Sequence, residues 1–142
     1  MSAIGNADLV FVQLPGRQAA DPLANLDAAS SVRIVVLEHM PGRRAHHHPR
    51  CEEVIYVASG RGAVWIDGET TPVTTGDVVH VPAGVAHATV PEPATTMRLV
   101  CFFPDPDLAS TTVETDLVVG VDTHAVARPD AATPTDRKDA QP

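Results

Sequence analysis

The chain has 142 residues, enough for one domain with its own apolar core but too few for two. Its formal net charge is −8, which argues against the basic surface that binds a nucleic-acid backbone or an anionic membrane. We therefore expect a single site that takes a small-molecule substrate or ligand, and neither nucleic acid nor membrane as a partner.

The N-terminal residues carry no basic cluster followed by a long apolar run, so we expect a cytoplasmic protein. Residues 1–31 are predicted to form an arm of strand and loop. Its strand is expected at residues 9–13, and residues 18–31, rich in Ala and Asp, should hold a loop or one short helix. In a reducing compartment Cys51 and Cys101 are expected to be free thiols.

Residues 32–120 have the pattern of an all-β domain. Thirteen prolines and nine glycines interrupt every candidate helix, while Val, Ile and Thr recur in short runs bounded by turn residues. Close, even spacing of such runs is typical of a sandwich or a barrel. The predicted strands are 32–40, 45–48, 53–58, 63–66, 71–74, 78–81, 87–90, 97–103 and 112–119.

The C-terminal tail is predicted to begin at residue 121 and to run to 142. After Arg128 it has almost no large apolar side chain and is rich in Asp, Thr, Ala and Pro. Such a segment cannot bury enough apolar surface to offset the entropy of ordering, so we expect disorder there.

The densest chemical signal is a cluster of histidines and glutamates in residues 46–53. Alternate side chains of a strand face the same way, so His46 and His48 should project together while His47 points to the opposite face. A carboxylate from the return strand would complete the group, but strand parity alone does not decide between Glu52 and Glu53. Imidazole and carboxylate groups at this spacing are typical metal ligands.

A second segment places one histidine at the start of a later strand. Gly76 is followed by a short apolar strand, then by a corner formed by Pro82 and Gly84, and then by His87. This corner would turn the chain so that the side chain of His87 points toward His46 and His48. Three imidazoles and one carboxylate would form a mixed N/O site that leaves coordination positions for water or substrate.

The first segment resembles the first sequence motif of the cupin superfamily. That motif reads glycine, a spacer, HxH, a short spacer, glutamate, six residues and glycine. Gly42, His46, His48, Glu53 and Gly60 fill it with a shortened first spacer. The final glycine implies that Glu53, rather than its neighbour, is the ligand.

The second segment resembles the second cupin motif, which reads glycine, five residues, PxG, two residues, histidine, three residues and asparagine. Gly76, Pro82, Gly84 and His87 match it, and Pro91 replaces the asparagine. That last position is not a metal ligand in the family.

The resemblance implies a jelly-roll, double-stranded β-helix barrel, usually dimeric, with one divalent metal ion inside its mouth. The implied ligands are His46, His48, Glu53 and His87. This donor set favours iron or manganese, with nickel or zinc as other candidates, because a structural zinc site would close its coordination shell and prefer thiolates. We accordingly expect a homodimer.

The family implies an enzyme that acts on a small oxygen-bearing molecule. Oxygenase-type chemistry is favoured, and decarboxylation, isomerisation and cyclisation stay open. Glu53 is expected to tune the charge of the ion and to accept a proton. The alternative is a binding or sensing module without turnover. A dry pocket is expected between the side chains of Ile55, Val57, Val64 and Ile66.

Other residues receive weaker assignments. His47 is expected to be exposed or to contact the metal ligands without binding the ion, and the weaker alternative is that a register slip at the bend makes it a ligand. His80 is expected on a strand surface, and the alternative is that it reaches the pocket rim. Cys51 receives no nucleophilic role. Tyr56 should pack outside the barrel or at a subunit contact, and Trp65 on the face opposite the inward-pointing Val64 and Ile66.

Overall fold

A computed structural model describes residues 2–108 and 112–120. These residues form antiparallel strands and one short 3-10 helix, η1 (Asn6–Asp8). None of the helical structure among them has the length and apolar character needed to cross a bilayer. The strands are β1 (Val12–Leu14), β2 (Arg17–Ala20), β3 (Ser31–Glu38), β4 (Arg43–His47), β5 (Glu53–Ser59), β6 (Arg61–Ile66), β7 (Glu69–Thr74), β8 (Val78–Val81), β9 (His87–Pro91), β10 (Thr96–Phe103) and β11 (Val113–Val119).

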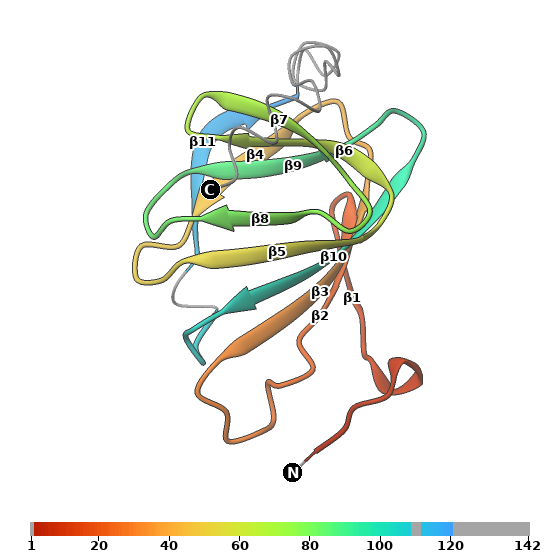
Figure 1. The fold of residues 1–142 in the computed structure, drawn as a ribbon, viewed down its shortest axis with the longest axis vertical. Coiled ribbons are helices and arrows are strands. Elements are labelled where there is room, and N and C mark those ends of the chain that lie inside the picture. Colours follow the sequence, from red (N-terminus) through yellow and green to blue (C-terminus); the bar gives the residue numbers. More distant parts are fainter. Residues whose placement is uncertain (1, 109–111, 121–142) are drawn as a thin grey trace.

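The strands form two sheets that face each other (Figure 1). One sheet has six strands in the order β1-β2-β3-β10-β5-β8, and the other has five in the order β11-β4-β9-β6-β7. Neighbours in a sheet are mostly distant in sequence, and the chain crosses repeatedly from one sheet to the other. The expected all-β jelly roll is confirmed.

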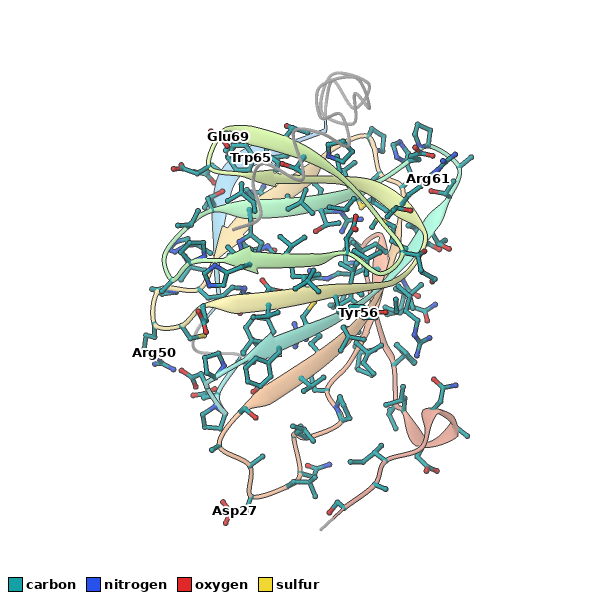
Figure 2. All side chains as sticks on the ribbon, in the orientation of Figure 1. Asp27, Arg50, Tyr56, Arg61, Trp65 and Glu69 are labelled. Carbon is teal, nitrogen blue, oxygen red and sulfur yellow. The ribbon has the colours of Figure 1, made fainter. Side chains whose placement is uncertain are left out.

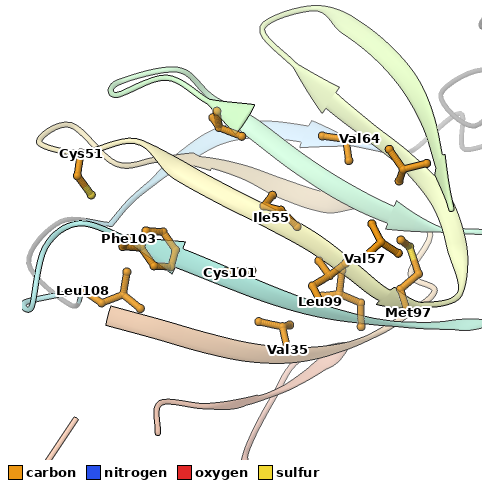
Figure 3. Packing of buried hydrophobic residues seen from close by; sticks show 13 residues of the cluster. Val35, Cys51, Ile55, Val57, Val64, Met97, Leu99, Cys101, Phe103 and Leu108 are labelled. Carbon is orange, nitrogen blue, oxygen red and sulfur yellow. The ribbon is translucent and has the colours of Figure 1, made fainter. Parts of the chain in front are cut away.

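The space between the sheets is filled by alternate side chains of the strands. On the six-stranded sheet Leu99 lies directly between Val35 and Val57 in register, and all three are buried. Figure 3 shows such side chains from β3, β5 and β10 pointing into the same interior. This regular alternation fixes which residues can reach an internal site.

The outer faces also carry apolar residues. Tyr56 is 46% exposed on the outside of β5 (Figure 2), as predicted. Strand register places Val100 and Val78 opposite it on the neighbouring strands. On the other sheet Trp65 packs against a second buried apolar cluster, whereas Val64 belongs to the core cluster with Val57 and Met97. The members of the second cluster are Ala45, Ala88, Val90 and Val119. The homodimer stays a prediction.

The arm differs from its predicted course. Its first strand is β1 at 12–14 rather than 9–13, and the segment expected to be loop or helix starts with strand β2. The Ala-rich β2 has little intrinsic strand preference, and its pairing with β3 holds it in the sheet, Arg17 opposite Leu37. The predicted tail, 121–142, lies outside the described residues.

Gly62 offers a test of how closely β6 and β9 approach. A Cβ added at Gly62 would clash with the carbonyl oxygen of Val90 and would lie 2.8 Å from the Cα of Pro91, closer than real contacts allow. We expect Gly62→Ala to lower the free energy of unfolding by about 2 kcal/mol or more, because backbone has to move. Urea unfolding measures this loss.

Gly68→Ala is the matched control. Gly68 has φ +93° and nothing within 4 Å of an added Cβ, so only backbone strain of about 1 kcal/mol is expected. A loss at Gly62 no larger than the loss at Gly68 would contradict the expectation that the close approach of β6 and β9 makes Gly62→Ala the costlier change.

Candidate metal centre

The first two predicted ligands come from β4 and its end. His46 points into the cavity, while Ala45 before it belongs to the second buried apolar cluster, as strand alternation requires. His46 lies directly opposite His87 in the β4–β9 pairing, and their ring centroids are 4.3 Å apart. The ring of His48 is 5.0 Å from that of His46.

The carboxylate comes from the other sheet. Glu53 opens β5 and is only 4% exposed. Its Oε1 lies 2.6 Å from Nε2 of His87 and 3.2 Å from Nε2 of His48. One ligand atom from each of these residues and from His46 lies within 4.8 Å of the others, so the four predicted residues form one compact group.

The corner before β9 aims His87. Gly84 adopts φ +78° and its N–H donates to the carbonyl of His48 at 2.8 Å, which ties the corner to the end of β4. The Nδ1–H of His87 donates to the carbonyl of Val85 at 3.0 Å. This bond fixes the ring with Nε2 toward Glu53, where Nε2 can donate to the carboxylate or, once its proton is lost, bind a metal.

His48 is oriented in a similar way. Its Nδ1 lies 3.2 Å from Oγ1 of Thr112, whose hydroxyl donates to the carbonyl of Leu108 at 2.9 Å. The hydroxyl oxygen is therefore able to accept the Nδ1–H, and Nε2 of His48 faces Glu53. The ring also packs edge-on against Phe103, with centroids 4.8 Å apart.

The protonation states suit metal binding. Burial, with help from the charge of neighbouring His87, lowers the pKa of His46 to about 3. Burial alone would raise the pKa of Glu53, but hydrogen bonds from His48 and His87 outweigh it and hold that pKa well below its usual range. Near neutral pH the imidazole of His46 is therefore neutral and the carboxylate of Glu53 is ionised.

The donor chemistry fits a divalent transition metal. Imidazole nitrogens and a carboxylate suit iron, manganese, nickel and zinc. Cys101 also faces the cavity, but burial and the negative charge of Glu53 raise the pKa of its thiol, so it stays protonated near neutral pH. The four residues that could hold the ion are thus His46, His48, Glu53 and His87.

The neighbouring polar residues lie outside this group. Glu52 is exposed and its carboxylate lies 2.8 Å from Nε2 of His80 on the outer face, so His80 does not line the cavity. His47 is half-buried on the face opposite His46. Cys51 is buried in the apolar core and does not line the cavity.

The cluster lies on the wall of a cavity of about 530 Å³ between the sheets. Much of the wall is apolar and includes Leu37, Met40, Leu99 and Phe103. Of the four aliphatic residues predicted to line a pocket, only Ile55 does so. The prediction was wrong for Val57, Val64 and Ile66, because these side chains pack into the core with Met97 instead of facing the cavity.

Sequence reasoning missed the arginines of the cavity wall, which are Arg17, Arg33, Arg43 and Arg44. A signal existed for Arg33, because it shares strand parity with the inward-facing Val35 and Leu37. No comparable signal existed for Arg17, since β2 was not predicted.

A family model for the cupin domain matches residues 34–103. The chain belongs to the cupin superfamily. The match covers β4, β5, β9 and β10, and therefore all four residues of the candidate metal centre.

Two curated relatives match this cupin over short segments. An uncharacterized protein of Streptomyces coelicolor is 58% identical over 36 residues, which is 25% of this chain and 34% of the relative. The polyketide synthase protein CurC of Streptomyces cyaneus is 41% identical over 49 residues, 33% of this chain and 32% of the relative. Each match thus spans about a third of the relative's length.

Solved structures share the fold at low sequence identity. A Streptomyces PAC13 variant bound to uridine has a TM-score of 0.70 at 14% identity, covering 87% of this cupin and 98% of that chain. KdgF from Halomonas has a TM-score of 0.63 at 21% identity, covering 73% and 94%. Salicylate 1,2-dioxygenase from Pseudoaminobacter salicylatoxidans has a TM-score of 0.63 at 21% identity, covering 75% and 31%.

Metal content distinguishes the inward-facing histidines from His47. We expect elemental analysis of this cupin, purified without chelating resin, to find close to one transition-metal ion per chain. His87→Ala should remove most of it, because His87 contributes a buried donor atom, whereas His47→Ala should leave it nearly unchanged. Equal loss in both variants would show that the assigned strand register is wrong.

The stability of the chelator-treated cupin should depend on pH through His46. Its folded-state pKa of about 3 lies below the ordinary 6.5, so below pH 6.5 the unfolded chain binds a proton that the folded protein does not. From this group alone, the free energy of unfolding should fall by about 2 kcal/mol between pH 7 and pH 5. Glu53, with its lowered pKa, adds a further loss only below its ordinary value of 4.5.

Urea unfolding at pH 7 and pH 5 tests this linkage. His46→Gln should remove most of the difference, whereas His80→Gln, at an exposed site, should retain it. The same pH dependence in wild type and His46→Gln would contradict a buried, neutral His46.

Proposed function

We propose that this cupin is a mononuclear metal-dependent enzyme that acts on a small oxygen-bearing molecule. The observation that carries the proposal is the position of the ligand cluster on the wall of a cavity of about 530 Å³, a size that suits a small organic ligand. Four protein donors leave open positions on a metal that commonly accepts six. A substrate oxygen in the cavity could reach such a position.

The residues around the cluster have separable roles in this proposal. The bound ion would act as a Lewis acid and template for the substrate. Glu53 contributes the negative charge that balances the ion and an oxygen that can accept a proton. The hydrogen bonds from His87 to Val85 and between His48 and Thr112 hold the imidazoles in place. Leu37, Leu99 and Phe103 keep water away from the reacting groups.

Oxygenase-type chemistry with iron or manganese is the reaction class we favour, ahead of decarboxylation, isomerisation and cyclisation. The named dioxygenase among proteins of similar fold supports this choice. The match to a protein named as a polyketide synthase supports substrates that resemble polyketides. Polyketides carry ketone and phenol oxygens, which are suitable donors to a metal.

Turnover should depend on the charge of Glu53 beyond its role in holding the metal. We expect Glu53→Gln to lower kcat per bound ion by about 10-fold or more, because the change keeps the shape but removes the charge next to the ion. Glu52→Gln is the matched control, since Glu52 is exposed and its carboxylate contacts His80 instead of the cluster. It should leave kcat unchanged.

The assay screens Fe(II)-, Mn(II)- and Ni(II)-loaded protein against phenolic and β-diketone compounds, with and without oxygen, and follows products by mass spectrometry. Binding of such compounds without any product in any metal form would refute the enzyme and favour a binding or sensing module.

A further inference from the structure

The arginines of the cavity wall stand out against the charge of the whole chain. The formal net charge is −8, yet four of the seven arginines in residues 2–108 and 112–120 line this one cavity. Guanidinium groups are the side chains that bind carboxylates with paired hydrogen bonds. Their existing partners therefore decide whether any of them is available to a ligand.

Three of these arginines already have acceptors. Arg33 forms two hydrogen bonds to the carboxylate of Asp21, at 2.7 and 2.8 Å. Arg43 donates to the carbonyls of Gly16 and Glu38, at 3.2 and 2.8 Å. Arg44 is exposed and lies 3.4 Å from Asp116.

Arg17 differs from the other three. In the part of the chain that the structure describes, its guanidinium has neither a hydrogen bond nor an ion pair. Burial and the positive charge of Arg33 lower its pKa, so Arg17 lies in a partly desolvated, cationic environment. The negative charge of Glu114, which also lines the cavity, raises the pKa of Arg17 and so opposes this lowering. The side chain of Glu114 is exposed, however, and forms no ion pair with Arg17.

The backbone around Arg17 is nevertheless firmly held. Gly16, in the β1–β2 turn, accepts hydrogen bonds from the N–H of Glu38 at 2.9 Å and from Arg43. Strand register places Arg17 opposite Leu37, whose side chain lines the same cavity. The turn thus directs the Arg17 side chain toward the interior, on a strand that none of the candidate metal ligands occupies.

We propose that Arg17 anchors a carboxylate of the ligand, while another oxygen of the same molecule reaches the metal cluster. The proposal rests on the proposed function and narrows its substrate class to carboxylic acids with an apolar or aromatic body. The guanidinium of Arg17, which has no counterion, would pair with the carboxylate of the ligand. The apolar wall of the cavity would contact the body of the ligand, and a metal held by the cluster that includes His46 and Glu53 would bind its second oxygen.

The test compares a charged probe with its neutral isostere. The compounds are 3,4-dihydroxybenzoate and 3,4-dihydroxybenzamide, which share the same pair of metal-binding hydroxyls and differ in the group at the far end of the ring. Isothermal titration of Mn(II)-loaded protein measures both dissociation constants. We expect wild type to bind the acid more tightly than the amide by about 10- to 100-fold, the range for a charged hydrogen-bonded pair.

Arg17→Gln should remove that preference by weakening acid binding by about 10- to 100-fold, with amide binding changed less than about twofold. Arg17→Lys should restore part of the acid preference, because it keeps the charge but not the paired donors. Arg61→Gln is the control, since Arg61 pairs with Glu92 away from the cavity and should alter neither constant. Unchanged amide binding also shows that the variant site is folded.

Three results would overturn the anchor: equal affinities of wild type for acid and amide, an equal loss of both in Arg17→Gln, or no binding of the acid at millimolar concentration. The readout is binding, so it is separate from the test of catalysis. A protein that shows the Arg17-dependent preference but converts no compound would refute the proposed enzyme and leave the anchor standing.

Discussion

The buried carboxylate of Glu53 is the interaction on which this molecule's organisation depends. An ionised carboxylate enclosed among apolar side chains costs several kcal/mol unless hydrogen bonds or a cation compensate it. The imidazoles of His48 and His87 supply that compensation from the opposite sheet, at 3.2 and 2.6 Å. The two sheets are therefore joined by polar groups at the cluster, whereas the apolar core around Val57 and Met97 fills the interior elsewhere.

Much of this arrangement could be predicted from the sequence, because alternation along a strand is a local property. It separates His46 and His48 from His47, and Val64 from Trp65, without any knowledge of neighbouring strands. The choice of Glu53 over Glu52 was different. Parity did not decide it, since residues 49–52 interrupt the alternation between β4 and β5, and the family spacing was needed.

The rest depended on pairings between residues distant in sequence. Nothing in the Ala-rich stretch at β2 favours a strand, and its pairing with β1 and β3 places Arg17 in the sheet. Arg33 was open to prediction from parity, but a charged residue in a strand is usually assigned to the solvent face. Its pair with Asp21 shows how the inward-facing position is tolerated.

The β1–β2 hairpin lies at one edge of the six-stranded sheet. The carbonyl of Gly16 in its turn accepts hydrogen bonds from the backbone N–H of Glu38 and from the guanidinium of Arg43. The metal-ligand candidates, by contrast, come from β4 and its end, β5 and β9. The proposed ligand anchor and the candidate metal ligands thus lie in separate stretches of the chain. If both proposals hold, a lineage could exchange or rebuild this edge hairpin and acquire a new ligand preference, while the segment with the candidate metal ligands is inherited unchanged.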